Sequence, residues 1–181
     1  MFDSHRTIAR LLRFPLLVLL LVCATGTTIL PQQALAQTPQ YLDDRSDPVQ
    51  VLKSYYNAIN LKQYVRAYYY WRQIGKSATS QPPAYPQFEA GYKDTAVVQL
   101  TTGKVTDDGA AGSVYYRVPV TLQSTLTNHS KHTFVGCYIL KQVNPSVFGV
   151  PPFIPIGIDS AQIQEVSNSA NFKLLIDSSC H

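Results

Sequence analysis

Two apolar repeats at helical spacing lie between residues 47 and 71, and long stretches with the pattern of β-strands follow them. Asp47 is a suitable N-cap for the first repeat, and Pro48 fits the first helical position because its missing N–H would be unpaired there anyway. The apolar residues of this repeat share one helical face and are Val49, Leu52, Tyr56 and Ile59. Helices that precede a run of strands favour an α+β fold.

The second repeat predicts another short helix. We expect Asn60 to end the first helix and to cap the second, and Gly75 to end the second. Four residues of this repeat share one face and are expected to be buried, namely Tyr64, Ala67, Tyr68 and Trp71.

The other side of the second helix carries Arg66, Tyr69 and Tyr70, which we expect to face outward. Arg and Tyr are favoured at interfaces because large, fairly rigid side chains bury area with little loss of entropy. These three residues are therefore candidates for contact with a partner. The alternative is that Tyr70 flanks the core and Tyr69 covers a loop.

The rest of the chain is mostly β-patterned. A loop at 77–85 and a short helix from Pro86 to Tyr92 come first, and strands are expected at about 95–105, 113–126, 131–143 and 160–166. Turns are expected at 107–109 and 127–130, so neighbouring strands should pair as antiparallel hairpins. Pro119 and Gly136 interrupt two strands and predict a bulge or bend, which would curve the sheet strongly.

The first 36 residues have the pattern of a secretory signal peptide. Three arginines precede an uncharged apolar run at 14–24, and residues 34–36 form the small-x-small pattern that a signal peptidase accepts. Cleavage there would leave a flexible tether over 37–46 and a single domain over 47–181. The alternatives are an uncleaved anchor, for which the run is short, and a lipoprotein signal at Cys23, which Val22 disfavours. We expect an exported protein, periplasmic or secreted.

The charge of the chain gives little sign of a nucleic-acid partner. The formal net charge is +4, and it falls to +2 without the signal peptide, which holds three of the 15 basic residues and one of the 11 acidic ones. No cluster of Lys and Arg is present in the remaining sequence, so we expect no nucleic acid as a partner. We also expect no membrane span once the signal peptide is removed.

The chain contains three cysteines, of which Cys23 lies in the signal peptide. The other two, Cys137 and Cys180, are expected to form a disulfide in an exported protein. This bridge would tie the C-terminal tail to a strand. The alternative is a nucleophilic Cys137, which would need a nearby cation or base, and its sequence neighbours are neutral.

The predicted order of elements resembles the nuclear transport factor 2-like fold, also called ketosteroid-isomerase-like or cystatin-like. The segments that carry the resemblance are the helix start at 47–48, the run at 55–59, the helix at 64–71 and the strand around 118–120, and together with the other strands they cover most of residues 47–166. The resemblance implies an α+β domain with N-terminal helices packed on a strongly curved, cone-shaped antiparallel sheet. It implies no particular activity, because this fold hosts both enzymes and binding domains.

The enzymes of this superfamily rely on an Asp base, or on His with Asp, inside the cone. This sequence contains no Asp or Glu between Gly109 and Ile158, so we expect no ionised acid in the interior. His129 and His132 flank a predicted turn, with no carboxylate expected nearby. We therefore predict no catalytic residue, no metal site and no cofactor. Residues 128–130 match a glycosylation sequon, but a turn asparagine is the better interpretation.

If the cone is hollow, aromatic side chains on its inner faces would line a cavity. The candidate ligand-binding residues are Tyr56, Tyr68, Trp71, Tyr116 and Tyr138. Their phenol groups would orient an apolar small molecule. The alternative is that these side chains simply fill the core.

The segment 144–158 is apolar but too rich in Pro and Gly for a helix or a central strand. It is expected either to fold over the core or to form an exposed patch, with Phe148 and Phe153 as further partner-contact candidates. The partner would be another protein, or a second copy of the chain docked through the sheet.

These patterns predict an exported, non-catalytic binding or protein-interaction module. The alternative is a small-molecule enzyme of lyase or isomerase type that uses the cavity, with Tyr116 or Tyr68 as the proton donor.

Overall fold

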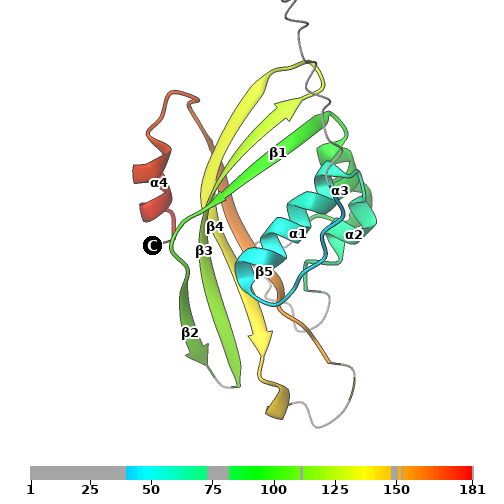
Figure 1. Cartoon of the computed structure of the whole chain (residues 1–181), viewed down its shortest axis with the longest axis vertical. Coiled ribbons are helices and arrows are strands. Elements are labelled where there is room, and N and C mark those ends of the chain that lie inside the picture. Colours follow the sequence, from blue (N-terminus) through cyan, green and yellow to red (C-terminus); the bar gives the residue numbers. More distant parts are fainter. Residues whose placement is uncertain (1–39, 73–81, 111, 148–150, 152, 181) are drawn as a thin grey trace, which may run out of the picture. The chain divides into compact units, whose positions relative to one another are not determined.

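The structure, a computed structural model, describes residues 40–72, 82–110, 112–147, 151 and 153–180, which belong to one compact unit, Gln37–His181. Three helices come first and the strands follow, as predicted, but a fourth helix, which the sequence analysis does not predict, comes after the last strand (Figure 1). The elements are α1 (Pro48–Asn60), α2 (Tyr64–Tyr68), α3 (Tyr85–Tyr92), β1 (Thr95–Thr102), β2 (Thr106–Ala110), β3 (Ser113–Leu126), β4 (Lys131–Val143), a 3-10 turn η1 (Pro145–Val147), β5 (Gly157–Val166) and α4 (Phe172–Ser178). The predicted signal peptide, Gly75 and Phe148 lie outside the described residues.

Helix α1 begins as predicted. The Oδ1 atom of Asp47 accepts hydrogen bonds from the backbone N–H groups of Val49 (2.8 Å) and Gln50 (3.0 Å), and Pro48 lies in the first turn. These bonds satisfy N–H groups that have no partner within the helix. The buried face is wider than the predicted stripe and consists of Pro48, Val51, Leu52, Ser54, Tyr55, Tyr56, Ala58 and Ile59.

Helix α2 is shorter than predicted, and Asn60 does not cap it. The helix ends at Tyr68, and Trp71 instead forms an isolated parallel bridge with Ile158 of β5. The side chain of Asn60 accepts from the N–H of Val98 (2.7 Å) and donates to its carbonyl oxygen (2.9 Å). Asn60 therefore pairs with the outer edge of β1 as a neighbouring strand would, and joins the end of α1 to the sheet.

Five strands form one antiparallel sheet in the order β1-β3-β4-β5, with β2 also paired to β3. Strand β1 pairs with residues 120–126 of β3, and β2 pairs with 113–117, so one long strand carries both. The predicted turn at 107–109 is wrong, because these residues belong to β2. The predicted hairpin at 127–130 is confirmed by the continuous pairing of β3 with β4.

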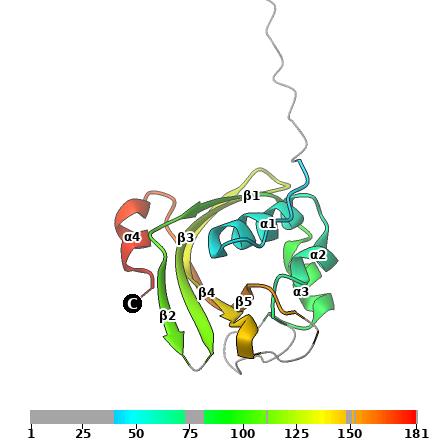
Figure 2. The same ribbon diagram turned by 60° about the horizontal axis from the view of Figure 1, so that its bottom comes forward.

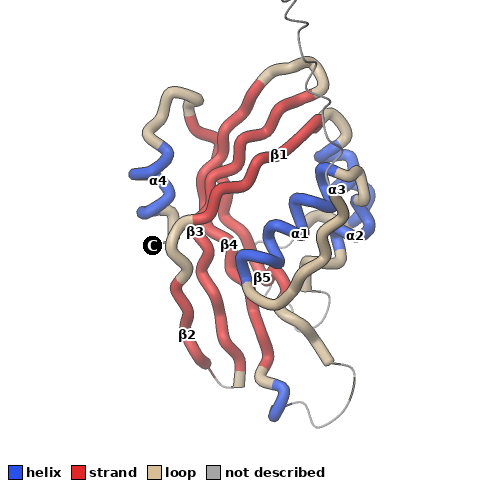
Figure 3. The backbone as a smooth tube through the Cα atoms, viewed as in Figure 1, coloured by secondary structure: helices blue, strands red, loops and turns tan. Residues whose placement is uncertain are grey.

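The sheet bends strongly, as Figure 3 shows, but the predicted bulges at Pro119 and Gly136 are absent from the pairing of β3 with β4. The register shifts elsewhere. One shift lies in β1 between Thr95 and Val97, and another lies beside Leu140, where β4 pairs with β5. Such irregularities increase local twist and help a sheet to curve.

Gly136 allows β4 and β5 to approach closely. A Cβ atom at this position would lie 2.0 Å from the backbone oxygen of Gln162 and 2.8 Å from the Cα of Ile163. These neighbours are backbone atoms of a paired strand and cannot move aside independently. The glycine is therefore needed for the close approach of the strands.

Helices α1, α2 and α3 cover one face of the curved sheet, and α4 lies on the other face (Figures 1 and 2). The predicted disulfide between Cys137 and Cys180 is present and joins β4 to the residues after α4. Beside it, the hydroxyl of Ser179 donates to the carbonyl oxygen of Gly136 (2.9 Å), and Ile176 of α4 is buried. This arrangement confirms the predicted α+β architecture, with the first three helices packed on one face of a strongly curved antiparallel sheet.

The segment 40–46, part of the predicted tether, is irregular but lies against α1. The N–H of Leu42 donates to Asn57 Oδ1 (2.9 Å), and the side chain of Asn57 donates to the carbonyl oxygen of Gln40 (2.7 Å). The N–H of Asp44 donates to the hydroxyl of Ser54 (2.8 Å). Residues 40–46 are therefore docked on α1.

The apolar segment 144–158 divides between the core and the surface. Ile156 and Ile158 are buried, whereas Val147 and Phe153 are exposed. The two predicted alternatives thus apply to different parts of the segment. Among the described residues, none of the helices is long and apolar enough to cross a membrane.

Candidate functional site

A cavity of about 350 Å³ lies between the sheet and helices α1 and α3. The apolar side chains that line it are Val98, Leu122, Leu126, Phe134 and Ile163. The polar side chains in the lining are Tyr56, Tyr92, Thr95, Ser124, His132 and Tyr138, and Gly91 of α3 borders the same space. A volume of this size and a largely apolar lining with a few polar groups are typical of ligand pockets.

Strand β4 gives the cavity two chemically different ends. His132, Phe134 and Tyr138 share one face of this strand because successive side chains alternate between the faces of a sheet. The Cα atoms of His132 and Tyr138 are roughly 20 Å apart along an extended strand. A half-buried imidazole therefore lies toward one end, and a buried phenol toward the other.

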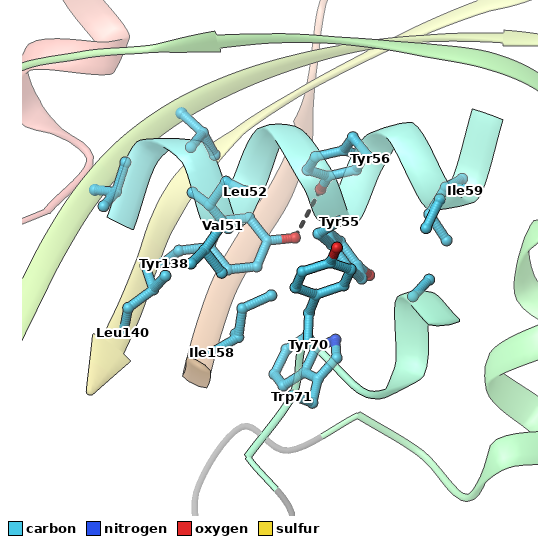
Figure 4. Packing of buried hydrophobic residues seen from close by; sticks show 14 of the residues in the cluster. Val51, Leu52, Tyr55, Tyr56, Ile59, Tyr70, Trp71, Tyr138, Leu140 and Ile158 are labelled. Atoms are coloured by element: carbon cyan, nitrogen blue, oxygen red, sulfur yellow. Dashed lines mark hydrogen bonds between the residues drawn. The ribbon is translucent and has the colours of Figure 1, made fainter. Parts of the chain in front are cut away.

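Tyr56 and Tyr138, two of the predicted pocket residues, meet at the buried end. Their hydroxyl oxygens are 2.6 Å apart, and both side chains are almost fully buried (Figure 4). One hydroxyl donates to the other, so this bond uses one of the two hydroxyl hydrogens. The pair is therefore able to donate one further hydrogen bond to an acceptor in the cavity.

Burial keeps this hydroxyl pair uncharged. Loss of hydration raises the pKa of both Tyr56 and Tyr138 well above the usual phenol value. The neighbouring phenols raise the pKa of Tyr56 further, whereas for Tyr138 the charge interaction with Tyr92 raises the pKa and the hydrogen bond with Tyr56 lowers it. Because the folded protein disfavours the phenolate, neither residue is a base near neutral pH. The pair acts as a neutral hydrogen-bond donor.

Tyr55, which the sequence did not single out as a site residue, lies at the centre of the aromatic cluster. Its ring packs edge-on against Tyr56, Tyr70, Trp71 and Tyr138, with centroid distances of 4.8 to 6.4 Å. Its hydroxyl lies 2.9 Å from that of a further lining residue, Tyr92 of α3. This second phenol pair holds α3 against α1 and so fixes one wall of the cavity.

His132 has a carboxylate partner, contrary to the prediction. Its Nδ1 atom lies 2.7 Å from Glu165 Oε1, and its Nε2 atom lies 3.3 Å from the hydroxyl of Ser130. Pairing of β4 with β5 brings His132 and Glu165 together across 33 positions of sequence. The sequence predicts both strands but not their pairing, and the long apolar segment that connects them does not define a register.

A buried ion pair also contradicts the expectation of an interior without ionised acids. Asp159 Oδ1 lies 3.8 Å from Arg72 Nε, and both side chains are almost fully buried. Asp159 is the extra residue at the register shift of β5, between Ile158 and Ser160. It is not among the described residues that line the cavity, and Arg72 also donates to a carbonyl oxygen of β4. The pair therefore joins the chain after α2 to the sheet.

The other three predicted pocket residues, Tyr68, Trp71 and Tyr116, are not among the described residues that line this cavity. Trp71 is buried and borders a second, open groove of about 500 Å³. Tyr68 packs edge-on against Tyr85 and donates to the carbonyl oxygen of Pro83 (3.3 Å). The hydroxyl of Tyr116 donates to a side-chain oxygen of β4 (3.0 Å). Tyr68 and Tyr116 are not among the described lining residues, which leaves Tyr56 and Tyr138 as the candidates at the cavity wall.

The predicted partner-contact residues Arg66, Tyr69 and Tyr70 do not form one outward patch. Tyr70 is fully buried, so the prediction that it faces outward is wrong, and its hydroxyl donates to Asp43 Oδ1 (2.6 Å). The Arg66 guanidinium is half-buried and donates to Asn57 Oδ1 (2.8 Å), which holds the docked N-terminal segment. Tyr69 and, from the apolar loop, Phe153 are exposed, at 63% and 65%.

Within the described part of the chain, no group of three or more His, Cys, Asp or Glu residues could hold a metal ion. The residues around the cavity instead suit an organic ligand, since they combine apolar side chains with neutral phenols.

Comparisons with known proteins found no matching family profile and no matching curated protein. Among solved structures, the chain is similar to Aln2 from a Streptomyces species, with 14% identity over 65% of this chain and 86% of that one and a TM-score of 0.41. It is also similar to a protein of unknown function from Mycobacterium tuberculosis, with 8% identity over 68% and 72% of the chains and a TM-score of 0.44. A protein of the NTF2-like family from Streptomyces avermitilis gives 8% identity over 64% and 91% of the chains and a TM-score of 0.42.

Proposed function

We propose that this protein binds a small, uncharged and mostly apolar molecule in the cavity between α1, α3 and the sheet, without converting it. The observation that carries the proposal is the hydroxyl pair of Tyr56 and Tyr138 at the wall of a largely apolar cavity of about 350 Å³. A buried donor surrounded by apolar side chains favours a ligand with one hydrogen-bond acceptor and an apolar body, such as an aryl ketone.

The polar group of the ligand is expected to be neutral. No Lys or Arg is among the described residues that line the cavity, and the imidazole of His132 is already paired with the Glu165 carboxylate, so an anionic ligand would lack a cationic partner of its own there. Burying a carboxylate without a cation costs much more than burying a carbonyl that accepts a hydrogen bond. A ketone should therefore bind better than the corresponding acid.

The groups around the cavity favour binding over catalysis. The raised pKa values of Tyr56 and Tyr138 keep these phenols protonated, so they do not remove protons from a ligand. Both ring nitrogens of His132 are engaged by side chains of the sheet and its hairpin, Glu165 and Ser130. Neither nitrogen is thus held ready for a ligand.

The role of the hydroxyl pair is tested by comparing acetophenone with ethylbenzene, which has a similar shape but no acceptor, in calorimetric titrations. We expect the unaltered protein to bind acetophenone about two- to twelvefold more tightly, because a net hydrogen bond contributes about 0.5–1.5 kcal/mol. In the double variant Tyr56→Phe/Tyr138→Phe this preference should disappear, whereas the affinity for ethylbenzene should stay within about twofold.

Tyr116→Phe is the matched control for this experiment, because Tyr116 contributes its hydroxyl to a bond within the sheet. This variant should keep the full preference for acetophenone. If the preference survives in the double variant, the hydroxyl pair does not orient the ligand. If the unaltered protein binds neither compound, the proposed function is wrong.

A second candidate function is proton transfer, and the observation that favours it is the His132–Glu165 pair beside the cavity. A histidine oriented by a carboxylate is a common general base. The check is exchange of the methyl protons of acetophenone for deuterium, followed by NMR in D2O. The binding proposal predicts no acceleration by the protein. An acceleration that is lost in His132→Gln would support the enzyme instead.

A further inference from the structure

Gly91 is a glycine that the backbone and the packing of the fold do not require. It lies inside α3, where glycine is less stable than alanine. Gly112 is the one glycine among the described residues whose φ angle is positive. The backbone at Gly91 therefore does not need the conformational freedom of glycine. A Cβ atom at position 91 would meet no heavy atom within 4 Å, so close packing does not exclude a side chain either.

Gly91 borders the open space of the proposed site. It is exposed, and it lines both the cavity of about 350 Å³ and the adjoining groove of about 500 Å³. Both spaces have Gly91 and Tyr92 of α3 on one side and Tyr138 and Ile163 of the sheet on the other. A side chain at position 91 would therefore enter space that a ligand is expected to use.

We propose that Gly91 determines ligand size, because its missing side chain leaves room between α3 and the β4–β5 part of the sheet for a bulky apolar body. This inference rests on the proposed function and narrows the ligand class to neutral ketones with two or more fused rings or an equally bulky chain. A single-ring ketone would leave much of the cavity unfilled, and unfilled apolar space forgoes dispersion contacts.

The test uses acetophenone and 2-acetylnaphthalene, which carry the same acceptor and differ by one fused ring. For Gly91→Leu we expect the dissociation constant of 2-acetylnaphthalene to rise about tenfold or more, because the added side chain competes for the same space. The dissociation constant of the smaller acetophenone should change by less than about threefold. Calorimetric titration of the purified protein measures both.

The matched control is Ala90→Leu, because Ala90 is exposed on the same helix and is not among the described lining residues. This variant should leave both dissociation constants within about twofold of the unaltered protein. A second variant, Gly91→Ala, separates binding from folding. It should raise Tm by about 1–3 °C through better helix propensity, and still lower the affinity for 2-acetylnaphthalene by about two- to threefold.

The possible results distinguish a failure of size selection by Gly91 from a failure of ligand binding itself. If Gly91→Leu and Gly91→Ala weaken both ketones equally, or neither ketone, Gly91 does not select by size, and the ligand site itself is unaffected. If the unaltered protein binds neither ketone, the ligand site is wrong, and the inference fails with it. A selective loss for the larger ketone, absent in Ala90→Leu, supports the role of Gly91.

Discussion

Replacement of Gly136 by alanine is expected to lower the free energy of unfolding by about 3 kcal/mol or more, at the upper end of the range for overpacking. The added methyl group would lie 2.0 Å from the backbone oxygen of Gln162, which belongs to the paired strand β5. Relief of this clash requires β4 and β5 to separate, which weakens their hydrogen bonds. Urea unfolding, followed by circular dichroism, measures the loss.

The matched control is Gly109→Ala on β2, where a Cβ atom would meet no heavy atom within 4 Å. This variant should change the free energy of unfolding by less than about 0.5 kcal/mol. A loss below about 1 kcal/mol for Gly136→Ala would mean that the two strands are not as close as described. The explanation of the sheet geometry at this point would then be wrong.

Loss of the disulfide is expected to destabilise the protein by about 4 kcal/mol, because the bridge closes a loop of 43 residues. In the double variant Cys137→Ala/Cys180→Ala the unfolded chain would regain the entropy that the bridge removes. Helix α4 should also detach more easily from the sheet. Urea unfolding of the unaltered protein with and without dithiothreitol should show the same loss as the double variant.

The double variant is its own control, because dithiothreitol should not change its unfolding curve. Equal stability of the unaltered protein with and without reductant would contradict the contribution of the bridge.

The helical part of the fold could be predicted well because its signals are local. Asp47 and Pro48 define the start of α1 within a few residues of sequence, and the structure shows the expected cap. The end of α2 was less well predicted. The repeat continues to Trp71, but this residue pairs with Ile158, far along the chain, and that tertiary contact replaces the last helical turn.

The sheet was predicted in outline but not in register. Residues 107–109 have the composition of a turn, yet they form part of β2 because the first half of β3 offers them a partner. The sequence marks Gly136 as unusual within a strand. The reason that the structure needs a glycine there is the close backbone of β5, which no local sequence pattern reveals. Strand pairing depends on partners distant in sequence, so the pattern alone leaves it open.

In the candidate site, too, features that depend on local sequence could be predicted, and features that depend on distant partners could not. Tyr56 and Tyr138 could be predicted as pocket residues because their positions on a helix and a strand determine the face on which they lie. The ionic partners of Glu165 and Asp159 could not be predicted, because they depend on the register of β5 and on the path of the chain after α2. The role proposed for Gly91 could not be predicted from the sequence, because it depends on the open space beside the residue in the folded protein.

A crystal structure of the protein grown with acetophenone would show whether a neutral apolar ligand binds beside the hydroxyl pair of Tyr56 and Tyr138. We predict electron density for the ketone inside the cavity, with its oxygen about 2.7 Å from one of the two hydroxyl oxygens. If rearranged side chains fill the cavity, or if the ketone is bound only on the outer surface, the hydroxyl pair is not a ligand site.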